Sequence, residues 1–203
     1  MIKAVIFDYD DTLVKTIESK WDALRETGKH FYNLEIKDSH IKKFWGLPYQ
    51  EMLTGVLMNA DLFENLNTNY ESVRSEFPML AFPDALNTIN ILLEGYKIGI
   101  LTSSAKKLVI EDLEMLKFPV NKFIKIQTSE DTDVHKPNPK VFEPILEVLK
   151  KEGVKKNEII YIGDSTRDFY AAKHAGIKFY GVTKNRSTPK IEFKTIGAEL
   201  LTT

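Results

Sequence analysis

Short apolar runs alternate with amphipathic segments along much of this chain. The runs are rich in Ile, Val, Phe and Tyr without a polar alternation, which is typical of strands buried on both faces. They lie at residues 2–7, 97–101, 123–127, 159–162 and 177–182. Helical spacing of apolar positions predicts helices at 84–94, 106–117, 139–151 and 167–175. Alternating strands and helices predict right-handed crossovers and a parallel sheet.

Residues 16–81 interrupt this alternation. Their pattern predicts helices at 17–30, 38–44, 50–58 and 62–77, and Asp38 and Asp61 are the expected N-caps of two of them. A helical block of this length is too long for an ordinary crossover between two strands. The expected fold class is therefore α/β, a Rossmann-like parallel sheet core (1–15 and 82–203) with an inserted α-helical cap subdomain (16–81).

The C-terminal part of the pattern is less regular. The polar segment 184–194 is expected to be a loop, and a short last strand is expected near 198–201. Gly95, Gly153 and Gly176 fall near the ends of predicted helices, where glycine accommodates a left-handed cap position.

Composition narrows the classes of protein that remain. A formal net charge of −1 gives no field that would attract nucleic acid. The chain has no cysteine, which excludes disulfides and thiolate metal sites and suits a reducing compartment. The N-terminal residues lack the pattern of a secretion signal, and no apolar run is long enough to cross a bilayer. A soluble cytoplasmic protein is the expectation, with no signal for its oligomeric state.

Two acids follow the first strand at once. Within the stretch Ala4–Leu13, the apolar run ends in Asp8 and Asp10, where the carboxyl end of a buried strand opens onto the ligand crevice of an α/β sheet. Carboxylates crowded there repel each other unless a cation lies between them. The alternative interpretation is that these acids cap a turn or a helix. Asp11 is expected to be a solvated turn residue.

Hydroxyls and a lysine follow two later segments. Thr102 and Ser103 come directly after the run 97–101 and before a predicted helix, a place that suits a phosphate oxygen or, alternatively, an ordinary helix cap. Lys136 precedes Pro137, which restricts the lysine backbone to extended conformations and fixes its direction. A lysine held in this way can neutralise phosphate charge, although a surface lysine is the simpler interpretation.

A last pair of acids follows the run 159–162. Asp164 and Asp168 are four residues apart at a strand-to-helix turn that contains Gly163. Carboxylates from two strand ends suit Mg²⁺, which is held by one or two carboxylates together with water and phosphate. The alternatives are an N-cap for Asp164 and a first-turn acid, favoured by the helix dipole, for Asp168. All four motifs are expected at one edge of one sheet.

Taken together in this order, the motifs resemble those of the haloacid dehalogenase superfamily, in its phosphatase branch with a helical cap. The resemblance covers nearly the whole chain. The matching motifs are Phe7-Asp8-Tyr9-Asp10-Asp11-Thr12-Leu13, Leu101-Thr102, Lys136-Pro137 and Gly163-Asp164-Ser165 through Asp168. Asp11 stands where glycine is frequent in this family, and Ser103 replaces the usual asparagine.

The resemblance implies a role for each of these positions. Asp8 would be the nucleophile that forms an aspartyl-phosphate, and Asp10 the general acid and base. Mg²⁺ would be held by Asp8, the backbone carbonyl of Asp10 and Asp164, with Asp168 acting directly or through water. Thr102, Ser103 and Lys136 would bind the phosphoryl oxygens.

The implied function is Mg²⁺-dependent hydrolysis of a small phosphorylated metabolite, a phosphate monoester, with no nucleic-acid or membrane partner. An acid at position 10 argues against dehalogenation, because the dehalogenases of this family lack it. Thr12 favours hydrolysis over phosphoryl transfer between sugar positions, since the sugar-phosphate mutases often carry valine there. A mutase of the same family is one alternative, and a non-catalytic module switched by aspartate phosphorylation is another.

Overall fold

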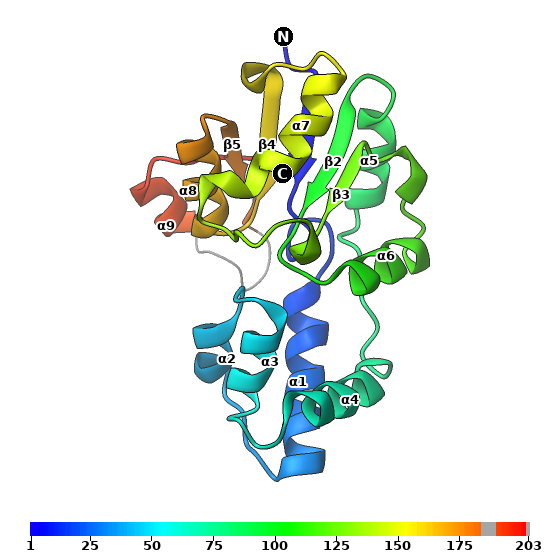
Figure 1. Ribbon diagram of the computed structural model, residues 1–203, viewed down its shortest axis with the longest axis vertical. Coiled ribbons are helices and arrows are strands. Elements are labelled where there is room, and N and C mark those ends of the chain that lie inside the picture. Colours follow the sequence, from blue (N-terminus) through cyan, green and yellow to red (C-terminus); the bar gives the residue numbers. More distant parts are fainter. Residues whose placement is uncertain (184–189, 202–203) are drawn as a thin grey trace. The chain divides into compact units, whose positions relative to one another are not determined.

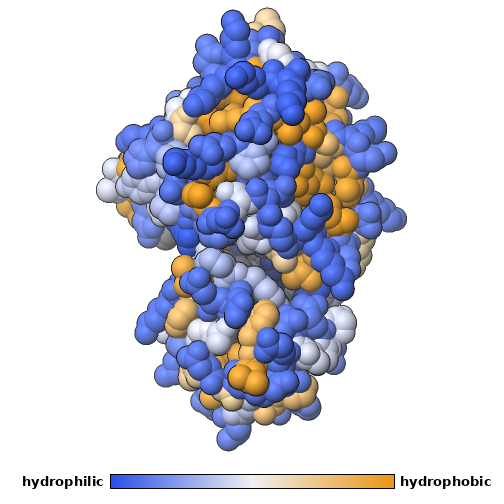
Figure 2. All heavy atoms as spheres, viewed as in Figure 1, coloured by the Kyte–Doolittle hydropathy of each residue, from blue (hydrophilic) through white to orange (hydrophobic). Residues whose placement is uncertain are grey.

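The computed structural model describes residues 1–183 and 190–201. The chain divides into two compact units: Met1–Val14 with Ala81–Thr203, here called the α/β unit, and Lys15–Leu80, here called the helical unit. Each unit encloses its own apolar core. On the face drawn in Figure 2, hydrophilic side chains cover most of the surface of each unit.

The α/β unit contains a six-stranded sheet in the order β3-β2-β1-β4-β5-β6 (Figure 1). Every adjacent pair of strands is parallel. The strands are β1 (Ala4–Phe7), β2 (Lys97–Leu101), β3 (Lys125–Gln127), β4 (Ile159–Gly163), β5 (Lys178–Gly181) and β6 (Glu199–Leu200). The predicted parallel α/β fold is confirmed. Residues 2–3 and 123–124, which were expected to begin the first and third strands, lie outside β1 and β3.

The strand order places β1 at the centre of the sheet. β1 pairs with β2 on one side and with β4 on the other, so the direction of the winding reverses there. At such a switch point the loops after the two strands separate and leave a crevice beyond their carboxyl ends. The residues that follow β1 and β4 are therefore the ones that this fold exposes to a ligand.

Helices connect these strands. They are α5 (Ala85–Leu92), α6 (Lys106–Met115), α7 (Glu143–Lys151), α8 (Thr166–Ala175) and α9 (Lys190–Thr195). Short 3₁₀ turns occur at Val120–Lys122, Ser129–Asp131, Pro139–Phe142 and Lys156–Glu158. The expected helix 139–151 thus begins with a 3₁₀ turn, and α7 crosses in front of the sheet in Figure 1.

One C-terminal prediction and one glycine prediction need correction. The prediction of a loop over 184–194 is wrong at 190–194, where the chain forms α9. This helix forms because Phe193 is fully buried and packs against Phe179, with ring centres 5.9 Å apart. Residues 184–189 lie outside the described residues. The last strand is confirmed as β6. Gly153 and Gly176 have left-handed φ angles of 73° and 71°, whereas Gly95 is not in that region.

The helical unit consists of α1 (Thr16–Tyr32), α2 (Asp38–Phe44), α3 (Tyr49–Val56) and α4 (Phe63–Arg74). Its core includes Trp21 and Leu53, both almost fully buried. None of the helices described is long and apolar enough to span a membrane.

The expected N-caps of this unit are wrong. Lys37 and Leu62 occupy the cap positions of α2 and α4. Asp38 is the first residue of α2, and its carboxylate pairs with Arg25 of α1. Asp61 precedes the cap position and accepts the Leu62 N–H at 2.7 Å.

Candidate active site

Two carboxylates lie side by side where β1 and β4 end. The N–H of Asp8 donates to the carbonyl of Ile162 at 2.8 Å, which extends the pairing of the two strands by one residue. Asp164 follows β4 directly. Both side chains are buried, with exposed fractions of 5% and 9%. The parallel pairing therefore brings together acids that are 156 positions apart in the sequence, and it does so away from bulk water.

Lys136 is buried between the acids. Its ammonium donates to Asp8 Oδ1 at 2.8 Å, to Asp168 Oδ1 at 2.7 Å and to the Tyr161 hydroxyl at 3.1 Å. An ammonium has three N–H donors, and all three are satisfied in this way. The alternative of a surface lysine is therefore wrong.

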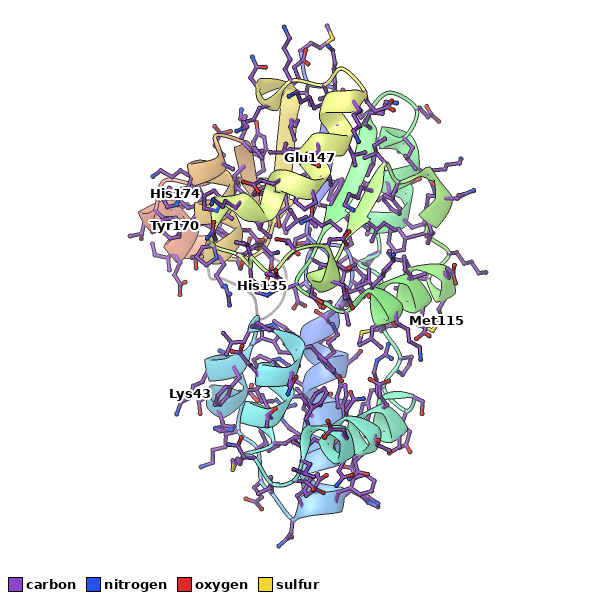
Figure 3. The ribbon with its side chains drawn as sticks, in the orientation of Figure 1. Lys43, Met115, His135, Glu147, Tyr170 and His174 are labelled. Carbon is purple, nitrogen blue, oxygen red and sulfur yellow. The ribbon has the colours of Figure 1, made fainter. Side chains whose placement is uncertain are left out.

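The backbone of the lysine segment is also fixed. Arg167 of α8 donates from Nε to the carbonyl of Lys136 at 3.0 Å, and the Lys136–Pro137 peptide bond is cis. On the C-terminal side, Asn138 accepts the N–H of Lys140 at 3.0 Å and caps the 3₁₀ turn that follows. Figure 3 labels His135, which immediately precedes the lysine between β3 and α7.

Asp168 links the lysine to the start of α8. Its Oδ1 accepts from Lys136 and from the Tyr161 hydroxyl, the latter at 2.7 Å. Its Oδ2 accepts the Ser165 N–H at 3.0 Å and the Ser165 hydroxyl, and Ser165 in turn caps the helix. Asp168 is thus a first-turn acid of a capping box and a partner of the lysine at once. The cap residue is Ser165 rather than Asp164.

Gly163 leaves the space that Asp168 fills. A Cβ atom at this position would lie 2.7 Å from Asp168 Cγ and 2.8 Å from Asp168 Cβ, closer than carbon atoms can approach. The absence of a side chain is therefore required for β4 and the first turn of α8 to meet at this distance.

Asp10 faces the hydroxyls that follow β2. Its Oδ2 accepts from Thr102 Oγ1 at 3.1 Å and from Ser104 Oγ at 2.7 Å. The Ser104 N–H also donates to Thr102 Oγ1 at 3.0 Å, so the hydroxyl loop is internally ordered. Ser104 was not among the predicted site residues, although the run of three hydroxyl residues after a strand is the signal that could have found it.

The N-terminus of α6 is occupied by a carboxylate of this chain. Glu130 accepts the Lys106 N–H with both oxygens at 3.0 Å, and Ala105 holds the cap position without a side-chain hydrogen bond. Thr102 and Ser103 are therefore not helix caps. Ser103 is half-buried in the loop between β2 and α6.

Asp11 differs from its prediction. It occupies a turn, but it is 1% exposed rather than solvated. Its φ of 53° is left-handed, and its N–H donates to the carbonyl of Val14 at 2.8 Å as the chain folds back. Glycine adopts this conformation most readily, which explains why glycine can stand at such a position. Asp tolerates it better than most other residues. The neighbouring Tyr9 is anchored through its hydroxyl to Asp112 of α6 at 2.9 Å.

Burial and like charges raise the pKa values of two of the acids. Burial, followed by the charge of Asp168, raises the pKa of Asp8 to about 8, although Lys136 opposes the shift. Burial, followed by Asp168 and Asp8, raises the pKa of Asp164 well above its usual range. Burial also acts on Asp168, but the charge and hydrogen bond of Lys136 outweigh it and lower the pKa of this carboxyl. The ammonium thus outweighs burial at Asp168, but it offsets burial and like charge only in part at Asp8 and Asp164.

The donor set fits a hard divalent cation. Asp8, Asp164 and Asp168 each offer a carboxylate oxygen, and these oxygens lie within 4.8 Å of one another. Oxygen ligands with surplus negative charge are those that Mg²⁺ prefers. Both oxygens of Asp168 already accept hydrogen bonds, whereas the carboxylate of Asp10 faces the hydroxyl loop instead.

Comparison of the chain with known proteins identifies the family to which it belongs. The family model described as "Haloacid dehalogenase-like hydrolase" matches residues 5–182 of the chain. The chain belongs to this family. The resemblance found in the sequence motifs is therefore confirmed, and the protein is a hydrolase by its family.

Among sequence relatives of this haloacid dehalogenase-like hydrolase, the "Putative pyrophosphatase PpaX" of Clostridium perfringens is 31% identical over 186 residues. The match covers 90% of this chain and 84% of the relative.

Solved structures support the same placement. A haloacid dehalogenase-like hydrolase of Bacteroides fragilis, itself titled "putative", superposes with a TM-score of 0.78 at 27% identity and covers 98% of this chain and 96% of the other. A protein of Thermotoga maritima titled "putative beta-phosphoglucomutase" gives a TM-score of 0.77 at 23% identity, covering 98% and 94%. The second likeness shows the fold alone.

Proposed function

We propose that this protein is a Mg²⁺-dependent phosphatase that hydrolyses a small phosphorylated metabolite through an aspartyl-phosphate on Asp8. The observation that carries the proposal is the buried Lys136 ammonium, which bridges Asp8 and Asp168 beside Asp164. Phosphoryl transfer depends on positioning and charge neutralisation more than on acid–base strength. A buried cation in contact with a buried carboxylate at a strand end supplies both.

In the first step, a carboxylate oxygen of Asp8 attacks phosphorus and the bond from phosphorus to the leaving oxygen breaks. Asp10 donates a proton to that leaving oxygen. In the second step, water attacks the phosphorus of the aspartyl-phosphate while Asp10 takes a proton from it. The bond between phosphorus and the Asp8 oxygen then breaks, which releases phosphate and restores both acids.

The surroundings of Asp10 suit the second of these steps. Two hydroxyl donors, Thr102 and Ser104, orient its carboxylate, which accepts a proton from water in this step. Thr102 and Ser103 are proposed to bind the phosphoryl oxygens together with Lys136. Lys136 also offsets the charge of Asp8, so that an anionic phosphoryl group can approach an anionic nucleophile.

Asp8 and Asp164 are the proposed carboxylate ligands of Mg²⁺, and the backbone carbonyl of Asp10 is the third proposed protein ligand. When bound, Mg²⁺ neutralises charge that develops on the phosphoryl oxygens. Asp168 would act through water, or through Lys136, since its oxygens are already occupied. The helical unit is the cap in this proposal.

The first substrate to test comes from the relatives. Those that carry the name PpaX are described as pyrophosphatases. Pyrophosphate would present one phosphoryl group to Asp8 and leave as orthophosphate, a leaving group that Asp10 needs to protonate only weakly. It therefore belongs in the assay beside phosphate monoesters.

The test is phosphate release from pyrophosphate, an aryl phosphate and a panel of phosphorylated metabolites, with and without Mg²⁺. We expect metal-dependent release by the wild type and a loss on the order of 10³-fold or more in Asp8→Asn. The matched control is Asp133→Asn, which makes the same change at an exposed position of the α/β unit. Full activity in Asp8→Asn would overturn the nucleophile assignment, and isomerisation of a hexose 1-phosphate without phosphate release would favour a mutase.

A further inference from the structure

Tyr161 places a hydroxyl at the centre of the site from inside the sheet. The residue belongs to β4, two positions before Gly163, and is fully buried. Its ring packs edge-on against Phe142, with ring centres 5.0 Å apart, and also contacts Phe179. The apolar core thus fixes the ring, and the ring fixes the direction in which the hydroxyl points.

The hydroxyl joins the lysine to its counter-ion. It donates to Asp168 Oδ1 at 2.7 Å and accepts from Lys136 Nζ at 3.1 Å. Because a tyrosine hydroxyl has one proton, donation to Asp168 leaves its lone pairs directed at the ammonium. The three groups therefore form a closed ring of hydrogen bonds, since Lys136 also donates to Asp168 directly.

We propose that Tyr161 is a positioning residue for Lys136, whose ammonium it holds in the orientation that bridges Asp8 and Asp168. Two of the three acceptors around the ammonium are carboxylates, and only the hydroxyl is neutral. The neutral acceptor orients the third N–H without adding a negative charge that would draw the ammonium away from Asp8. The proposal rests on the proposed function, in which Lys136 acts on the phosphoryl group.

Removal of the hydroxyl has a definite consequence in this geometry. A phenylalanine ring would keep the contacts with Phe142 and Phe179, but one buried N–H of Lys136 would lose its acceptor. An ammonium that lacks an acceptor reorients toward the groups that remain. Its alignment with the oxygens of the transferred phosphoryl group is then lost, which lowers kcat more than it changes KM.

The experiment compares two hydroxyl-free variants, Tyr161→Phe and Tyr161→Met, with the wild type. The matched control is Tyr180→Phe, which removes a hydroxyl from the half-buried tyrosine of β5 that contacts the exposed Lys178. Three quantities are measured: kcat and KM on the best substrate of the screen, the melting temperature, and the ¹⁵N NMR signal of the Lys136 ammonium. The signal is assigned by its absence in Lys136→Met.

We expect kcat to fall about tenfold in the Tyr161 variants, with KM within about twofold, as for other residues that orient a group in a site. The ammonium signal is expected in the wild type and in Tyr180→Phe, because protons held by three acceptors exchange slowly with water. It is expected to broaden or disappear in both Tyr161 variants.

Persistence of the ammonium signal in the hydroxyl-free variants, or its absence from the wild type, would overturn the proposal whatever happens to kcat. An unchanged kcat in an active enzyme would overturn it as well, as would a fall in melting temperature with kcat per folded molecule unchanged. If the wild type hydrolyses none of the substrates, the proposed function fails, and the NMR comparison alone decides whether Tyr161 positions the lysine.

Discussion

Replacement of Lys136 by methionine is expected to lower the rate of hydrolysis and to raise the affinity of the site for Mg²⁺. Hydrolysis should be lost, because the variant lacks the cation that faces the phosphoryl group in the proposed function. Binding of Mg²⁺ should become tighter, because the same cation repels the metal. Methionine keeps most of the volume of the lysine stem in this buried position and removes only the charge and its three donors.

The distances set the scale of the effect on Mg²⁺ binding. The ammonium lies 2.8 Å from Asp8 Oδ1, and the candidate ligand oxygens lie within 4.8 Å of one another, so a bound metal would be a near neighbour of the ammonium. A unit charge and a divalent ion 4 Å apart interact by about 8 kcal/mol at an effective dielectric constant of 20. The acids of the variant lose a counter-charge and bind protons more tightly, which opposes metal binding, and we expect a net gain of about 1.4 kcal/mol, which is tenfold in affinity.

The assay is calorimetric titration with MgCl₂ at about pH 9, where Asp8 has released its proton. Phosphate release is measured in parallel, and a loss of about 10²- to 10³-fold is expected for the missing donor. The matched control is Lys140→Met, since Lys140 is an exposed lysine of the same segment. It removes the same charge from the surface, where solvent and salt screen it.

Weaker Mg²⁺ binding in Lys136→Met than in Lys140→Met would refute this reasoning. It would mean that the lysine organises Asp8 for the metal more than it competes with it. Tighter binding together with retained hydrolysis would instead refute the role of Lys136 in phosphoryl transfer while leaving the electrostatic argument intact.

Two further predictions concern stability. Gly163→Ala should cost about 1–3 kcal/mol in urea unfolding and lower kcat, since the new Cβ would lie 2.7 Å from Asp168 Cγ; wild-type values of both would contradict the close approach. Without a divalent cation, the folded state holds a proton on Asp8 that the unfolded chain releases, because burial raises the pKa of this carboxyl from 3.8 to about 8. Stability present below about pH 4 should therefore be lost as the pH rises through about 8, and wild-type melting temperatures that follow those of Asp8→Asn over this interval would exclude the effect.

Local patterns in the sequence were sufficient to predict the sheet and most of the helices. A buried strand is specified by its own run of apolar residues, and a helix by its own spacing, so neither depends on distant partners. The predictions of the helix caps were wrong because they depend on contacts with distant parts of the chain. Asp38 pairs with Arg25, an interaction between two helices that no local pattern contains.

The same distinction applies to the site. Asp8, Lys136 and Asp164 could be predicted because each follows a strand or precedes a proline, and the topology of a parallel sheet brings strand ends together. Tyr161 could not, because an aromatic residue inside a buried strand indicates packing, and its hydrogen bonds reach residues 25 positions before it and 7 after it. The burial of Asp11 also depends on how the chain folds back after β1.

The charge balance at the ends of β1 and β4 connects protons, metal and substrate. Three carboxylates and one ammonium carry two surplus negative charges when all are ionised, and burial makes that state costly. Without a cation, burial and the neighbouring carboxylates therefore raise the pKa values of Asp8 and Asp164, which favours their protonated forms. A divalent cation held by Asp8 and Asp164 would compete with protons for these carboxylates, and its charge would favour an anionic phosphoryl group that the carboxylates alone would repel. In the proposed function, proton release on metal binding would prepare Asp8 to attack, because only the ionised carboxylate is a nucleophile.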